Sequence, residues 1–149
     1  MKLILLEEPG SELEVQIRYP VRDAEVDRLI ERIEDKKPRI MGTTEEENRI
    51  LSLDEIYYAE SVDRKTFLYT KEQVYRCNKK IYQLLEEWKD YGFIQTGKAA
   101  IVNMNQMVNV KVLWNSRLEA TLVNDEKIII SRTYIKAVRD WLENEEGQE

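Results

Sequence analysis

The segment Phe93–Asn103, FIQTGKAAIVN, contains residue types that suit the binding of an anion. An apolar pair gives way to Gln95, Thr96, Gly97 and Lys98 before the chain becomes apolar again. A glycine allows the backbone to approach a phosphate closely or to take an unusual turn. A lysine beside it supplies a positive charge for a phosphate or for the edge of a guanine. From these residues alone, the commoner alternative is a solvated loop lysine.

The junction between KIIIS and RTYIK is a second candidate site. Polarity changes abruptly at Ser131 and Arg132, and a helix that begins there offers free backbone N–H groups, which suit a phosphate. An arginine can bond to O6 and N7 of guanine together, for about 1–3 kcal/mol of discrimination between bases. The alternative is that Arg132 pairs with a carboxylate such as Asp63 or Glu60.

A third candidate is the charged segment VDRKT, which we expect to be the tip of a hairpin. In most proteins such a tip is a solvated turn. Beside the other two segments, Arg64, Lys65 and Thr66 become candidates for contacts with phosphates and bases. Arg117 and Lys111 either widen this footprint or are ordinary surface charge.

The composition excludes several kinds of catalysis. The chain has no histidine and one cysteine, Cys77. Nucleophilic catalysis that uses Ser-His-Asp or Cys-His is therefore excluded, as are most zinc sites and an internal disulfide. Paired carboxylates occur easily by chance among 29 acidic residues. We expect no catalysis, no metal, no cofactor and no small-molecule substrate.

Charge is distributed unevenly along the chain, whose net charge is −6. Residues 47–142 contain 15 Lys and Arg against 13 Asp and Glu, whereas the rest of the chain contains 8 against 16. A mildly basic body is therefore flanked by acidic ends. Because binding to nucleic acid depends on the local field of one face, this distribution permits a DNA-binding body without requiring one.

The elements that position these residues are mostly short strands. Residues 2–7 and 13–19 read as strands joined by a Pro-Gly turn, and residues 23–37 have the periodicity of a helix capped by Asp23. Short β-like pieces follow the TTEEEN segment, interrupted by a helix over residues 79–92 that ends at Gly92. This helix has an apolar stripe of Ile81, Leu84, Leu85 and Trp88. A final helix over residues 132–144 begins at Ser131, a suitable cap.

This pattern predicts two parts and a mostly β fold. Residues 1–46 form a small α+β N-terminal extension, a candidate dimerisation or regulatory surface. Residues 47–149 form a β-rich body with one central and one C-terminal helix. The beginning of the sequence lacks the apolar length and cleavage site of a signal peptide, so we expect a cytoplasmic protein.

From about Ile50 to Leu142, the chain resembles the LytTR domain, the β-rich DNA-binding domain of bacterial transcription regulators. The resemblance lies in an ordered set of pieces rather than in any one of them. They are LDEIYYAES, KTFLYT, LLEEW, FIQTGKAAIVNMNQM and SRLEATLVNDEKIIISRTYIKAV. The first 46 residues are more loosely similar to the extension of short, stand-alone family members.

The resemblance implies a regulator of transcription that reads double-stranded DNA through loops between strands, inserted into successive major grooves. The loops would supply the DNA-binding residues Arg64, Lys65, Thr66, Gln95, Lys98, Ser131 and Arg132. It also implies two copies, as a homodimer on a repeated site, and an inhibitory membrane-protein partner, as stand-alone members often have.

The segment around Lys98 departs from the family pattern, which runs Phe-x-Arg-x-Ser-Lys-Ser. Here the arginine is Gln95 and the two serines are Gly97 and Ala99. The departure removes one cation and two hydroxyl donors. Together with the overall acidity, it favours an alternative: a LytTR-fold protein-interaction module with weak or lost DNA binding. A carboxylate-using hydrolase is a weaker third option.

Overall fold

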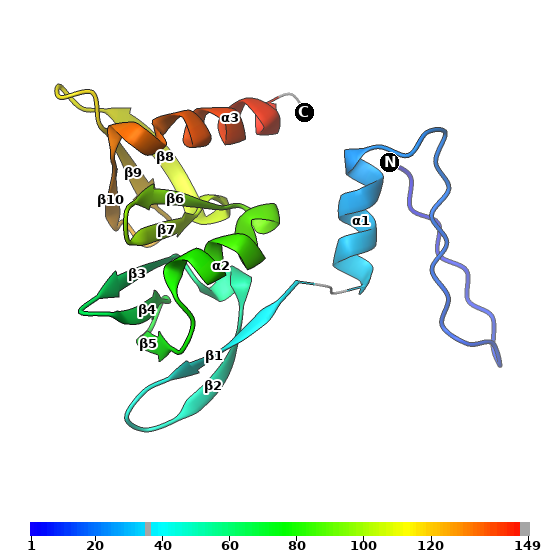
Figure 1. Ribbon diagram of the computed structural model, residues 1–149. Coiled ribbons are helices and arrows are strands. Elements are labelled where there is room, and N and C mark those ends of the chain that lie inside the picture. Colours follow the sequence, from blue (N-terminus) through cyan, green and yellow to red (C-terminus); the bar gives the residue numbers. More distant parts are fainter. Residues whose placement is uncertain (35–36, 147–149) are drawn as a thin grey trace. The chain divides into compact units, whose positions relative to one another are not determined.

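The computed structural model describes residues 1–34 and 37–146 (Figure 1). The chain divides into two compact units, Met1–Glu34 and Asp35–Glu149. In its described residues, no helix is long and apolar enough to cross a membrane.

The first unit contains one helix, α1 (Ala24–Glu34). Asp23 caps it as expected, because its Oδ1 accepts a hydrogen bond from the backbone N–H of Val26 at 3.0 Å. The Pro9–Gly10 turn is also present: the N–H of Ser11 bonds to the carbonyl of Glu8 at 3.2 Å, with Gly10 at φ 90°.

The strands expected at residues 2–7 and 13–19 are not formed in the single chain. Residues 1–22 are described throughout and contain no strand. The apolar side chains of these segments are largely exposed, up to 99 % at Leu13. An isolated two-stranded hairpin is marginally stable in water, so the alternating pattern alone does not hold a ladder together.

The second unit is built on a seven-stranded antiparallel sheet in the order β2-β1-β5-β4-β3-β7-β6. Its strands are β1 (Arg39–Thr43), β2 (Asn48–Ser52), β3 (Tyr58–Val62), β4 (Lys65–Tyr69), β5 (Val74–Cys77), β6 (Phe93–Gly97) and β7 (Ala100–Asn103).

A three-stranded antiparallel sheet, in the order β10-β9-β8, follows it. Its strands are β8 (Met107–Val112), β9 (Leu118–Leu122) and β10 (Lys127–Ile130). The helices of this unit are α2 (Ile81–Trp88) and α3 (Ile135–Glu146), with short 3-10 helices at Leu53–Glu55, Lys89–Tyr91, Met104–Gln106 and Arg132–Tyr134. The expected fold, mostly β with a central and a C-terminal helix, is confirmed.

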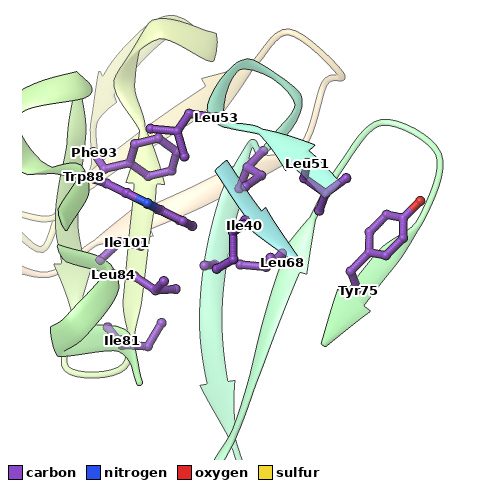
Figure 2. Close-up of a cluster of buried hydrophobic side chains, with 12 residues drawn as sticks. Ile40, Leu51, Leu53, Leu68, Tyr75, Ile81, Leu84, Trp88, Phe93 and Ile101 are labelled. Atoms are coloured by element: carbon purple, nitrogen blue, oxygen red, sulfur yellow. The ribbon is translucent and has the colours of Figure 1, made fainter. Parts of the chain in front are cut away.

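The larger core lies between α2 and the seven-stranded sheet (Figure 2). Its apolar stripe is the one that the sequence periodicity predicted: Ile81, Leu84 and Trp88 are all buried. The ring of Trp88 packs on Phe93 with centroids 4.9 Å apart. The last turn of this helical segment ends at Gly92, whose φ of 91° allows the chain to reverse into β6.

The sequence placed a boundary at residues 46 and 47, inside a hairpin of the observed sheet. β1 pairs with β2 along its whole length, from Arg39 opposite Ser52 to Thr43 opposite Asn48. Residues 44–47 are the turn between these strands, and the division between compact units falls at residues 34 and 35. As a statement about functional parts, the division into 1–46 and 47–149 stays a prediction.

A second core lies between the three-stranded sheet and α3, and Asn103 links it to the first. The side chain of Asn103 is 1 % exposed. Its Nδ2 donates to the carbonyls of Leu53 at 3.2 Å and Ile56 at 3.0 Å, and its Oδ1 accepts from the N–H of Asn105 at 3.1 Å. Leu53 and Ile56 belong to the first core, and Met104 beside Asn103 belongs to the second.

Replacing Asn103 with alanine should destabilise the protein by about 2–4 kcal/mol. The carbonyl of Ile56 and the N–H of Asn105 lose their bonds to the Asn103 side chain, and the carbonyl of Leu53 keeps only its bond from the N–H of Ile56. Urea denaturation measures the change. Asn109→Ala, on an exposed position of β8, is the control and should change the free energy of unfolding by less than about 0.5 kcal/mol. Equal effects of the two substitutions would contradict the structural role of Asn103.

Candidate functional site

The turn between β3 and β4 consists of Asp63 and Arg64. Val62 pairs with Lys65, so two residues close the hairpin. Both have positive φ, 53° and 67°, as in a type I′ turn, whose twist matches that of the flanking strands. The tight turn projects the exposed side chain of Arg64 from the end of the sheet.

The turn between β6 and β7 consists of Lys98 and Ala99, since Gly97 pairs with Ala100. Lys98 is exposed. The side chain of Gln95 supports the turn, with Nε2 donating to the carbonyl of Lys98 at 3.4 Å. This part of β6 is irregular: its register shifts between Gln95 and Gly97.

Of the two uses considered for Gly97, the unusual backbone turn is not observed, and the close approach to a phosphate stays a prediction. Among the described residues, the glycines with positive φ are Gly10 and Gly92. A Cβ added at Gly97 would have no neighbour within 4 Å. Neither the backbone conformation nor nearby atoms therefore require a glycine at this position.

The strand register brings these two turns to the same end of the seven-stranded sheet. β3 runs toward the first turn and β7 runs away from the second, and the strands are paired antiparallel with Glu60 opposite Ala100. The N–H of Ser61 also bonds to the carbonyl of Ala99 at 2.8 Å. Figure 1 shows the tips of both hairpins on the same, left-hand side.

The junction before α3 lies at this end as well. The N–H of Ser131 donates to the carbonyl of Thr96 in β6 at 3.1 Å. The helical segment begins at Arg132 as a 3-10 turn with Ser131 at the predicted cap position, but the Ser131 side chain makes no capping hydrogen bond. Arg132 is exposed, and the salt bridges found among the described residues include none between it and Asp63 or Glu60.

We call this end of the sheet the rim and define it by its exposed or half-buried polar side chains. They are Arg64, Lys65, Gln95, Lys98, Ser131 and Arg132. The remaining predicted site residue, Thr66, is only 3 % exposed. Its side chain points into the protein, because alternate residues of β4 face opposite sides of the sheet.

Arg76 is a rim cation that sequence reasoning missed. It lies on β5 opposite Phe67 and lines a hollow with Arg64, Lys65 and Cys77. The signal was the alternation in QVYRC, which buries Tyr75 and leaves Arg76 exposed on the other face. In the described part of the chain, no salt bridge engages Arg64, Lys65, Lys98 or Arg76.

A second hollow on the rim contains both signs of charge. It is lined in part by Glu60, Gly97, Lys127 and Ser131. The carboxylate of Glu60 accepts a hydrogen bond from the hydroxyl of Tyr69. Burial and, to a lesser extent, this bond raise the pKa of Tyr69 to about 12. One acidic side chain therefore interrupts the positive charge, although a neighbouring hydroxyl already engages it.

The aromatic side chains near the rim do not form a stacking platform. The rings of Tyr58 and Tyr69 stack on each other across β3 and β4, with centroids 4.1 Å apart and planes at 9°. Trp88 is fully buried. Trp114 is 97 % exposed, in the turn between β8 and β9, and this turn also carries Arg117. Because Leu118 pairs with Ile130, the β8–β9 turn lies at the end of β10 that leads to Ser131.

The arrangement suits contact with a polyanion rather than catalysis. Cations from four separate segments meet at one end of a rigid sheet, on tight turns and strand ends. Lysine and arginine side chains of this kind bind phosphates, and an arginine also recognises the edge of a guanine. Single-stranded nucleic acid would call for exposed aromatic faces, which this rim does not gather.

Comparisons with known proteins agree with this geometry. Residues 46–143 match the family model of the LytTr DNA-binding domain. The chain is 23 % identical over 93 residues to the sensory transduction protein LytT of Enterococcus faecalis, a match covering 62 % of this chain and 38 % of that protein. It is 24 % identical over 98 residues to LytT of Bacillus cereus, covering 66 % and 40 %. The matches thus span less than half the length of these curated relatives.

The fold matches that of a solved LytTr DNA-binding domain from Bacillus cereus. The TM-score is 0.66 at 20 % sequence identity, and the match covers 71 % of this chain and 97 % of that one.

Replacing Gly97 with alanine should change the free energy of unfolding by less than about 1 kcal/mol, since nothing crowds the added methyl group. Gly92→Ala is the contrasting variant: its Cβ would lie 2.5 Å from Nδ2 of Asn105, at a positive φ. It should cost more than about 1 kcal/mol. Thermal denaturation of both variants measures the difference, and equal losses would contradict the described turn.

Proposed function

Since this chain belongs to the LytTR family of DNA-binding domains, we propose that it is a sequence-specific regulator of transcription that binds double-stranded DNA through the rim. In this proposal the turns Asp63–Arg64 and Lys98–Ala99 and the junction at Ser131–Arg132 enter successive major grooves on one side of the duplex.

The observation that carries the proposal is the convergence of unpaired cations from distant parts of the chain. The pairing of β3 with β7 and the bond from Ser131 to Thr96 hold three projecting segments at one end of the sheet. Because these segments are tight turns and strand ends rather than long loops, their backbone needs little ordering when they bind.

The residues would divide their roles by chemistry. Lys98 and Lys65 act as point charges for phosphates, which fix the position of the protein on DNA. Arg132 and Arg64 have the planar donor groups that recognise guanine. Gln95 supports the Lys98 turn through Nε2 and keeps Oε1 available as an acceptor. The buried Thr66 acts through its strand rather than by direct contact.

The proposal also covers location, stoichiometry and catalysis. The protein acts in the cytoplasm, where its DNA is, and it binds as two copies on a repeated site. It acts without catalysis. An inhibitory membrane-protein partner belongs to the proposal only through the likeness to stand-alone family members.

Substitutions at Lys98 and Arg132 should affect DNA binding differently. Lys98→Ala should weaken binding to all duplexes alike and make the slope of log affinity against log salt shallower by about 0.9. Arg132→Ala should weaken binding to the specific site more than to random duplex, by about 1–3 kcal/mol. Fluorescence anisotropy titrations with the chain's own upstream region, at several salt concentrations, measure both effects.

Lys89→Ala is the matched control for charge. Lys89 precedes β6 and so lies at the opposite end of that strand from Lys98, where it pairs with Glu86 at 3.2 Å. It should leave binding unchanged. If specific and random duplexes bind equally weakly even at low salt, the protein is instead an interaction module that has kept the fold.

Restoring the family's arginine should strengthen DNA binding. Gln95→Arg adds a cation beside Lys98 and should steepen the salt slope by about 0.9 per added phosphate contact. The same titrations measure it, with Gln73→Arg, on the exposed residue before β5, as the control for an added charge elsewhere. An unchanged slope for Gln95→Arg would place residue 95 outside the interface.

A further inference from the structure

The first 22 residues expose an unusual number of apolar side chains. Leu13 is 99 % exposed, Leu5 83 % and Leu3 79 %. The alternation over residues 13–19 is strict, with apolar side chains at odd positions and polar ones at even positions. This is the pattern of a strand with one buried face, yet within the first unit these apolar side chains stay largely exposed.

The turn that would join two such strands is already in place. Pro9 and Gly10 form it, and both N–H and Oγ of Ser11 donate to the carbonyl of Glu8, at 3.2 and 2.7 Å. What is missing is further strands, because a hairpin needs a third strand or a packed helix to become stable. The α1 helix offers an amphipathic face for such a sheet, with Leu29 and Ile30 half-buried and Ile33 exposed.

The sequence of residues 13–19 is complementary to itself when two copies run antiparallel about Gln16. In that register Glu14 lies opposite Arg18 of the other copy, twice over by symmetry. Val15 lies opposite Ile17, so the apolar faces coincide. A parallel arrangement would instead set each Glu14 against its equivalent, which is unfavourable.

Other antiparallel registers have less of this complementarity within residues 13–19. A register centred on Ile17 leaves no glutamate opposite an arginine there. A register centred on Val15 sets Glu12 opposite Arg18 but leaves Glu14 opposite Gln16, so Glu12→Arg distinguishes it from the register centred on Gln16. A register centred between two residues sets odd positions against even ones, so that apolar and polar faces meet. Pro20 then ends the strand, since it has no N–H for a ladder.

We propose that residues 13–19 pair antiparallel with the same segment of a second copy, centred on Gln16. The two hairpins then form one four-stranded sheet, and the α1 helices cover its apolar face. The occupant of this surface is therefore a second copy of the chain. The inference concerns self-association without DNA, and so it does not depend on the proposed DNA binding.

A charge exchange in the full-length chain tests the register. Glu14→Arg sets arginine against arginine at two symmetric positions and should weaken the dimer about tenfold or more. The double variant Glu14→Arg/Arg18→Glu recreates both opposite-charge pairs and should return the dissociation constant to within about threefold of the original. Sedimentation equilibrium measures all of these constants.

Glu12→Arg is the control for charge, because in this register residue 12 faces Pro20. It should leave the dissociation constant unchanged, and circular dichroism should show that all variants are folded. A chain that stays monomeric at every accessible concentration overturns the proposal. A dimer that is insensitive to Glu14→Arg, or not rescued by the double variant, overturns it too.

Cross-linking gives an independent measurement. Gln16→Cys places two thiols opposite each other across the symmetry axis and should form an intermolecular disulfide under mild oxidation. Glu14→Cys should not, because its two copies lie about four residues, or roughly 13 Å, apart. Burial raises the pKa of the native Cys77 thiol, which slows its competing oxidation. Equal cross-linking of both variants contradicts the proposed register.

Discussion

The buried amide of Asn103 determines how the two sheets of the second unit meet. It stands at the end of β7, where the chain leaves the larger sheet, and satisfies two carbonyls and one N–H at once. Its own N–H bonds to the carbonyl of Tyr57, just before β3. A polar side chain in such a place is stabilising only when all its partners are in position, so it admits a single arrangement of the surrounding segments.

That arrangement has a consequence at the other end of β6 and β7. With one end of these strands held beside Asn103, their turn at Lys98 and Ala99 projects from the opposite end, where the carbonyl of Thr96 receives Ser131. Arg132, which follows the last strand of the smaller sheet, therefore lies at the same end of the larger sheet as Arg64. The electrostatic character of the rim therefore follows from strand register and one interior hydrogen-bond network, although the chain as a whole is acidic.

Much of this fold could be predicted from local sequence because the relevant signals were short-range. The stripe of α2, the Asp23 cap and the Gly92 stop depend on neighbours within a few residues. The failures have long-range causes. Residues 2–7 and 13–19 have the alternation of strands. A strand also needs a neighbouring strand to pair with, and the alternation does not show whether one is present. Ser131 occupies the predicted cap position without a side-chain capping bond, and its backbone N–H forms a contact to β6 that local sequence did not predict.

The candidate site could be predicted only in outline. The sequence identified its cations other than Arg76, but not which side of a strand each residue would take. Thr66 lies on the inward side of β4, whereas Arg76 lies on the outward side of β5, and only the register of a whole sheet separates them. The open space around Gly97 likewise depends on three-dimensional packing and could not be predicted from the sequence.

The tip of the β3–β4 hairpin illustrates a conflict between backbone preference and side-chain chemistry. Left-handed backbone conformations suit glycine, asparagine and aspartate, so Asp63 fits its position, whereas Arg64 adopts such a conformation at a cost. Glycine at residue 64 would adopt the positive φ without steric cost but has no guanidinium group. In the proposed function, the guanidinium group of Arg64 at the tip of this hairpin therefore comes with a backbone cost of order 1 kcal/mol.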